Sequence, residues 1–169
     1  MICYLIGTNH AHQLEGDKDG DSVAFATYLT ALCSDNRIDL MAEELNEEAI
    51  TLWKAQGSVV RSVASRLSIC HLFCDPKRED RRRLSILTVG EAAKKLGYEL
   101  SWTREQNAAV EAEARKTWPA RERFWLERLR QVPFNRCAFV LGAEHVHTFG
   151  NLLSSEGFTV HVAQSYWKP

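Results

Sequence analysis

The chain has 169 residues, with 21 basic and 22 acidic side chains and a formal net charge of −1. Hydrophobic residues make up 45% of the chain and charged residues 25%, which is typical of a globular domain and not of a disordered chain. The balanced charge argues against a nucleic acid as the main partner, and no apolar stretch approaches the length of a membrane span. We therefore expect one domain, residues 1–169, with a substantial core.

The first six residues are apolar but too few for a signal peptide, and they lack its basic start. The five cysteines are odd in number and form no C-x-x-C pair, so a disulfide framework is not expected. These features predict a cytoplasmic protein whose cysteines act as small hydrophobic residues. Packing is also the preferred interpretation of Cys74, because no neighbouring sequence feature favours a reactive thiolate.

Short apolar runs alternate with longer segments of helical spacing along the whole chain. Strands are expected over residues 1–6, 38–44, 68–74, 137–141 and 158–162. Helices are expected over residues 23–33, 47–55, 60–67, 78–98, 103–130 with a break near Trp118-Pro119, and 146–156. This alternation predicts an α/β fold, with a mostly parallel sheet of about five strands and helices on both faces.

Polar side chains follow several of the predicted strands. Because parallel strands end at the same edge of a sheet, and ligands bind outside that edge, these side chains are expected to converge on one rim. The candidates are His10, Glu43, Glu44, Asp75 and His145. The sequence therefore predicts that His10 and His145 lie on the same rim, close enough to contact one ligand.

Two Gly-x-x-His turns carry most of this prediction: Gly7-Thr8-Asn9-His10 and Gly142-Ala143-Glu144-His145. Each follows an apolar strand, and its glycine allows a sharp turn that leaves backbone N–H groups accessible. Gly7, Asn9 and Gly142 are therefore candidate ligand-binding residues. The remaining histidines, His12, His147 and His161, are interpreted as ordinary loop or core residues.

Glu43 and Glu44 are adjacent on a predicted strand, so their side chains should point to opposite faces and only one should enter the site. We expect this to be Glu44. A carboxylate beside two histidines suits a divalent cation or a general base. Alternatively, one of the two acids begins the next helix, where a negative charge is favoured.

Three further residues have two interpretations each. His71 lies within the third predicted strand and is either a buried neutral imidazole or a ligand-binding group. Asp75 precedes Pro76, is held extended, and could orient a histidine. Arg121 shares a helix face with Trp125, and could bind a substrate carboxylate or phosphate, pair with a site glutamate, or form a surface salt bridge.

The chain resembles the Tiki/TraB superfamily, which includes erythromycin-esterase-like and ChaN-like proteins. The resemblance rests on five segments in the family's order. These are Leu5-Ile6-Gly7-Thr8-Asn9-His10, Leu40-Met41-Ala42-Glu43-Glu44, Arg121-Glu122 through Trp125, Leu141-Gly142-Ala143-Glu144-His145, and Leu152-Leu153 to Gly157-Phe158-Thr159-Val160. It implies a shared α/β fold and, in Tiki proteins, a metal-dependent peptidase. Other members hydrolyse esters or bind haem-related ligands. The chain is smaller than most members and lacks the secretory and membrane features of Tiki proteins.

The sequence therefore leads to a small hydrolase acting on an ester, amide or peptide bond of a small-molecule or peptide ligand. His10, Glu44 and His145 would hold a divalent metal ion of unspecified identity or position a water molecule, and Arg121 would stabilise developing negative charge. There are two alternatives. The first is a non-catalytic binding module that uses the same rim, and the second is a protein whose former site now has only a structural role. The sequence leaves open whether the protein forms a homo-oligomer. His145 is not expected to be a packing residue, so His145→Ala should cost only about 1–2 kcal/mol.

Overall fold

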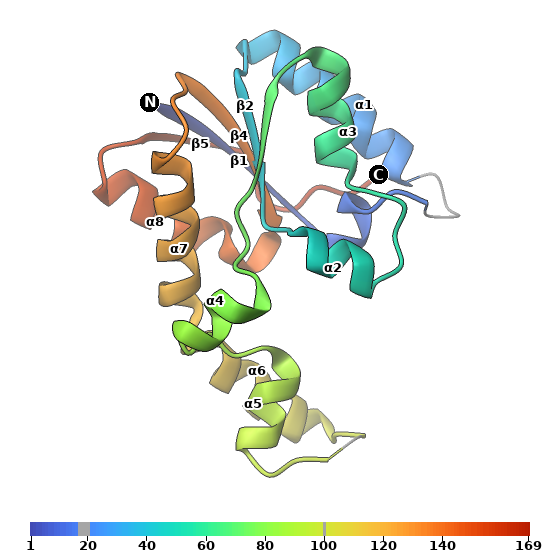
Figure 1. Ribbon diagram of the computed structural model, residues 1–169, viewed down its shortest axis with the longest axis vertical. Coiled ribbons are helices and arrows are strands. Elements are labelled where there is room, and N and C mark those ends of the chain that lie inside the picture. Colours follow the sequence, from blue (N-terminus) through green and yellow to red (C-terminus); the bar gives the residue numbers. More distant parts are fainter. Residues whose placement is uncertain (17–20, 100) are drawn as a thin grey trace.

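The computed structural model describes residues 1–16, 21–99 and 101–169, and it contains a five-stranded, all-parallel sheet (Figure 1). The strands lie in the order β3-β2-β4-β1-β5. They are β1 (Ile2–Thr8), β2 (Leu40–Glu43), β3 (Cys70–Phe73), β4 (Arg136–Gly142) and β5 (Thr159–Gln164). Each falls where an apolar run predicted it, so the expected α/β fold is confirmed.

Helices cover both faces of the sheet. The element α1 (Asp21–Asn36) packs with α3 (Val59–Leu67) on one face, and α7 (Trp118–Arg130) with α8 (Val146–Ser155) on the other (Figure 1). The short helix α2 (Glu47–Leu52) follows β2. Two 3₁₀ turns, η1 (His10–Gln13) and η2 (Ala143–His145), follow β1 and β4. No helix among the described residues is both long and apolar enough to cross a membrane.

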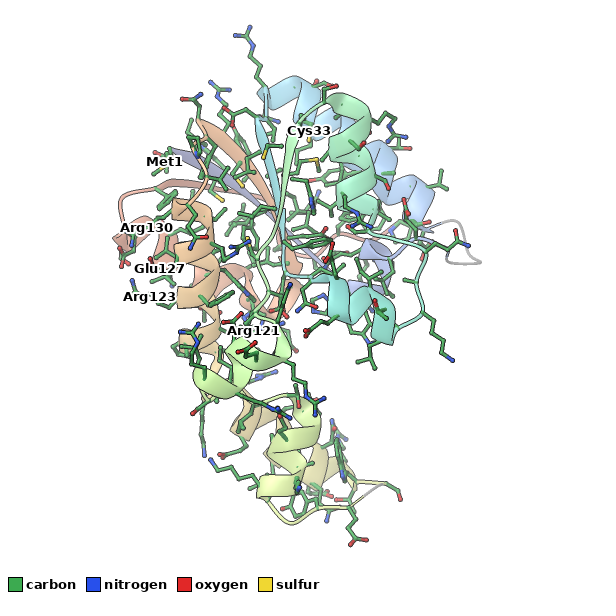
Figure 2. The ribbon with its side chains drawn as sticks, viewed as in Figure 1. Met1, Cys33, Arg121, Arg123, Glu127 and Arg130 are labelled. Carbon is green, nitrogen blue, oxygen red and sulfur yellow. The ribbon has the colours of Figure 1, made fainter. Side chains whose placement is uncertain are left out.

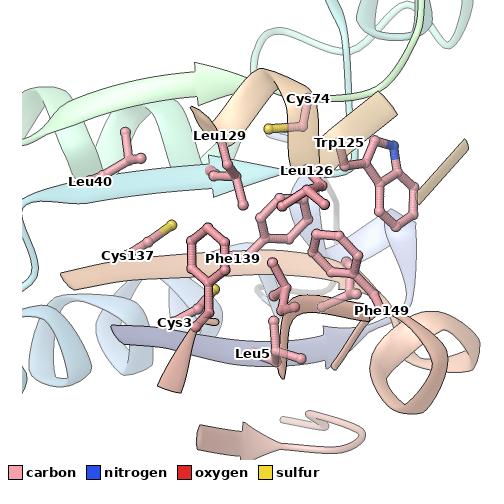
Figure 3. Close-up of a cluster of buried hydrophobic side chains, with 14 of the residues drawn as sticks. Cys3, Leu5, Leu40, Cys74, Trp125, Leu126, Leu129, Cys137, Phe139 and Phe149 are labelled. Atoms are coloured by element: carbon pink, nitrogen blue, oxygen red, sulfur yellow. The ribbon is translucent and has the colours of Figure 1, made fainter. Parts of the chain in front are cut away.

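The core divides into two layers because successive side chains of a strand point to opposite faces. In β2, Leu40 and Ala42 face α7 and α8, whereas Met41 faces α1 and α3. The first layer contains the fully buried Trp125, Phe139 and others, and Figure 3 shows these side chains packed between the sheet and α7. The alternation continues through β2, so it sends the next two residues, Glu43 and Glu44, to different layers.

A helical arm, defined as residues 78–99 and 101–117, projects from the carboxyl end of the sheet (Figure 1). It contains α4 (Arg78–Arg83), α5 (Val89–Lys95) and α6 (Arg104–Arg115), and its own small apolar cluster is centred on Ala92, Ala93, Val110 and Ala114. The expected single helix over 78–98 is wrong. The chain breaks after α4 at Ser85, which has a left-handed φ of 55°, and restarts at a capping box formed by Thr88 and Glu91.

Candidate functional site

The two Gly-x-x-His turns lie side by side because β1 and β4 are neighbouring parallel strands. Thr8 pairs with Gly142 at the ends of these strands, so both turns leave the sheet at the same level. Close packing explains both glycines. A Cβ on Gly7 would lie 2.2 Å from the Ser165 carbonyl oxygen, and one on Gly142 would lie 3.2 Å from His10 Nε2. Gly7 therefore serves the packing of the turn, whereas Gly142 gives room to the site itself.

Glu44 is the centre of the cluster at this rim, and its side chain is completely buried. The Oε2 atom of Glu44 accepts a hydrogen bond of 2.7 Å from the backbone N–H of Gly142. Around Oε1 lie Nη1 of Arg121 at 2.7 Å, Nε2 of His10 at 3.5 Å and Nε2 of His145 at 3.8 Å. The structure thus brings His10 and His145 to one carboxylate, on the same rim as expected, and Glu44 is the acid that faces them.

Arg121 links Glu44 to Asp75. Its Nε donates to Asp75 Oδ1 at 2.7 Å, while Arg81 Nη2 binds the other oxygen of Asp75 at 2.5 Å. Burial alone would raise the pKa of Asp75, but the charges of Arg121 and Arg81 outweigh it and lower that pKa. Burial likewise opposes the charge of Arg121, yet Glu44 and Asp75 raise its pKa. The guanidinium is therefore a buried cation bound by two carboxylates, not a surface residue.

His145 belongs to the core, and the expectation that it lies outside the packing is wrong. Its side chain is only 4% exposed, and its ring lies 4.0 Å from that of Trp118 and 5.0 Å from that of Trp125, measured between centroids. Its Nδ1 is 2.7 Å from Oε1 of Glu122, which also accepts from the Thr148 hydroxyl. The turn after β4 is short and enters α8 directly, so the imidazole is carried beneath α7 rather than out into solvent.

Glu122 is a site residue to which the sequence analysis assigned no role, although it lies in the Arg121–Trp125 segment. Its position in the sequence nevertheless indicates a buried acid. Glu122 lies on the same buried face of α7 as Trp125, Leu126 and Leu129, at helical spacing. An acid in an apolar stripe must be paired when buried, and a histidine at the neighbouring strand end was the available partner.

His10 is the open member of the cluster, with 37% of its side chain exposed. Asn9 caps the turn that carries His10, because its Oδ1 accepts a hydrogen bond from the backbone N–H of Ala11. The Nδ1 of His10 lies 3.1 Å from Nε2 of Gln13, a fully buried amide that the sequence reading did not single out. Gln13 therefore holds the His10 ring from the side of the imidazole opposite Nε2.

Glu43 and His71 are not part of the Glu44 cluster. Glu43 points to the opposite layer, where its Oε1 accepts from the Ser58 hydroxyl at 2.5 Å and lies 2.8 Å from Nε2 of His71. Ser58 is the N-cap of α3, so Glu43 faces a helix, as the pleat requires. The two candidate ligand-binding residues thus pair with one another. Cys74 is fully buried, and burial raises the pKa of its thiol well above the usual range, which agrees with a packing role.

The side chains around Glu44 Oε1 have the chemistry of metal ligands, but they do not form a closed cage. Among residues 1–16, 21–99 and 101–169, no group of three or more His, Cys, Asp or Glu side chains is arranged to hold a metal ion. Glu44 Oε1 is nevertheless buried and accepts no hydrogen bond of good geometry, although Arg121 Nη1 lies close by. This carboxylate oxygen and the two nearby imidazole nitrogens are ligand atoms of the types that bind a divalent cation.

Comparisons with protein families, curated proteins and solved structures gave no match to this chain.

Proposed function

We propose that the Glu44 cluster is a hydrolytic centre that binds a divalent cation and acts on an ester, amide or peptide bond. One observation carries this proposal. The carboxylate of Glu122 accepts a hydrogen bond from Nδ1–H of His145, so Nε2 of the neutral ring presents a lone pair toward Glu44 Oε1, 3.8 Å away. Arg121 already contacts this oxygen, but the His145 lone pair that faces the carboxylate favours a further cation between these two atoms.

The charge of the cluster also favours a cation. The connected carboxylates are those of Glu44, Asp75 and Glu122, whereas the connected cations are only Arg81 and Arg121. One buried negative charge is therefore left without a partner in this network when both histidines are neutral. A bound cation would offset that charge, which otherwise costs several kcal/mol.

His10, Glu44 and His145 would hold the ion, which when bound would polarise a carbonyl group and make water a better nucleophile at neutral pH. Glu122 holds His145 in the tautomer that leaves Nε2 free. Arg121 holds Glu44 in place, and its two carboxylate partners leave it little capacity to stabilise charge on a substrate. The role first expected for Arg121 therefore becomes that of a positioning residue, while His10, on the exposed side, faces the incoming bond.

A second candidate function is a ligand-binding module without catalysis. It is favoured by burial, because the side chains of Glu44 and His145 are 0% and 4% exposed, which leaves His10 as the accessible member of the three. The resemblance to the Tiki/TraB superfamily, in which Tiki proteins are metal-dependent peptidases and other members hydrolyse esters, favours the first proposal.

A metal titration tests the proposal. Protein purified without chelator or histidine tag should contain stoichiometric metal, or bind Zn²⁺ or Mn²⁺ in calorimetry, and Glu44→Gln should weaken this binding at least about tenfold because a first ligand is lost. The matched control is Glu144→Gln, a carboxylate of the second Gly-x-x-His turn that is exposed and pairs with Arg115. Equal metal affinity in both variants, or none in the parent, would leave the binding module as the better explanation.

A further inference from the structure

The accessible side of the Glu44 cluster is flanked by an exposed tryptophan. The Trp53 ring lies 6.4 Å from the His10 ring between centroids, with the planes tilted by 37°. Trp53 is 48% exposed and its neighbour Leu52 is 76% exposed. All five tryptophans of the chain lie within the described residues, and the other four are buried or half-buried. The tryptophan with the least packing is therefore the one beside the accessible histidine.

The fold fixes Trp53 through its backbone rather than through a core contact. Trp53 ends α2, and its N–H bonds to the carbonyl of Ala49 and to that of Thr51. At the other end of α2, Asn46 caps the helix by accepting from the Ala49 N–H and donates to the Pro76 carbonyl. Holding a large indole exposed costs the protein burial energy, yet it prepares a rigid apolar surface at little entropy cost on binding.

The charges at the rim indicate what kind of ring would bind. Arg121 is the cation that contacts Glu44, and because it is already bound by two carboxylates it offers no free charge to a substrate carboxylate or phosphate. The surface around Trp53 has no excess of either charge, because the acids Glu47 and Glu48 that begin α2 are matched by Arg61, 3.8 Å from Glu47, and by the exposed Lys54 that follows Trp53. An uncharged ring therefore suits this rim better than an anionic one.

We propose that Trp53 is a specificity-determining residue that stacks on an uncharged aromatic ring of the substrate, so that the site acts on aryl or benzyl esters or amides. This inference rests on the proposed hydrolytic function. The ring would lie on the indole while the bond to be cleaved reaches past His10 toward Glu44. Stacking on an indole is worth about tenfold in affinity for one ring.

The test measures binding first and hydrolysis second. In ligand-observed NMR, N-benzylacetamide should bind the parent about tenfold more tightly than N-ethylacetamide, which lacks the ring. Trp53→Ala should lose this advantage, Trp53→Phe should keep most of it, and Tyr166→Ala, which removes an exposed aromatic ring that contacts Lys168, should change nothing. With 5-fluorotryptophan, the ¹⁹F signal missing from Trp53→Phe should be the one that N-benzylacetamide shifts.

The outcomes separate this inference from the proposed function. Ring binding at Trp53 without metal binding or hydrolysis would uphold the stacking surface and remove the hydrolase. If the enzyme hydrolyses benzyl and ethyl acetates with equal KM, or if Trp53→Ala binds N-benzylacetamide as well as the parent does, the stacking role is overturned while the hydrolase stands. For an active enzyme, Trp53→Ala should raise KM for benzyl acetate about tenfold and leave KM for ethyl acetate unchanged.

Discussion

Arg121→Leu is expected to lower the free energy of unfolding by about 3–5 kcal/mol, because it leaves two buried carboxylates without their shared cation. Glu44 would keep only the backbone N–H of Gly142 as a close partner, and Asp75 would keep Arg81 and the indole N–H of Trp125. Chemical denaturation of the parent and the variant measures the loss. A loss below about 1 kcal/mol would mean that Arg121 behaves as a surface ion pair.

A matched control lies two residues away on the same helix. Arg123 is half-exposed and pairs with Glu156 on the outer side of α7, whereas Arg121 lies where α7 meets the arm (Figure 2). Arg123→Leu should therefore change the free energy of unfolding by less than about 1 kcal/mol. The double variant Arg121→Leu/Asp75→Asn should recover part of the loss, since it removes one of the stranded charges.

The pH dependence of the Arg121→Leu effect follows from Asp75. Its pKa is lowered in the folded protein, so its ionised form contributes stability above the unfolded pKa of about 4, and this contribution is lost as pH falls through the folded value. Without Arg121 the folded pKa should rise. The difference in unfolding free energy between parent and variant should thus be largest at neutral pH and shrink below about pH 4. A difference that stays constant from pH 7 to pH 3 would assign the loss to packing alone.

His145→Ala should cost about 3 kcal/mol of stability, more than the sequence alone suggested. It leaves a cavity between Trp118 and Trp125 and strips Glu122 of its histidine partner, with only the Thr148 hydroxyl remaining. His161 is the matched control, because it is exposed on β5 and stacks on Tyr4, so His161→Ala should cost less than about 1 kcal/mol. Thermal and urea unfolding of both variants measure the two losses.

A further variant separates the histidine's two roles. In Glu122→Gln the amide can still bind His145, so the fold should be retained, but the imidazole is no longer held by a negative charge. Metal affinity should then fall while stability changes little.

Similar stability of His145→Ala and the parent would show that the His145 ring is not a packing element. The small loss expected from the sequence would then be the better value.

The strands could be predicted from the sequence because each is an apolar run ended by a glycine, an acid or a polar turn. The placement of His10, Glu44 and His145 on one rim followed from parallel strands alone, whereas their contact depends on the strand order β2-β4-β1. The choice of Glu44 over Glu43 depended on the pleat, and the register of β2 decided it. These are local patterns, and local patterns are what a sequence displays directly.

The remaining features depend on contacts between distant segments. No glycine or proline marks the break at Ser85, so nothing local distinguished two short helices from one long one. The burial of His145 arises because α7 lies over η2, and the pairing of Glu43 with His71 arises because β3 lies beside β2. The arm follows from a small apolar cluster within residues 87–114, whose alanines resemble ordinary helix surface in the sequence.

The position of β1 in the sheet has a consequence for how the chain acquires its structure during synthesis. The first strand made lies between the two made last, with Ile2 paired to Arg136 on one side and to Thr159 on the other. While the ribosome adds the residues in between, Leu5 and Ile6 have no neighbouring strand to cover them. Sheets closed by such long-range pairs form slowly, so this sheet cannot be completed before β5 has been synthesised, and β1 stays without its strand partners until then.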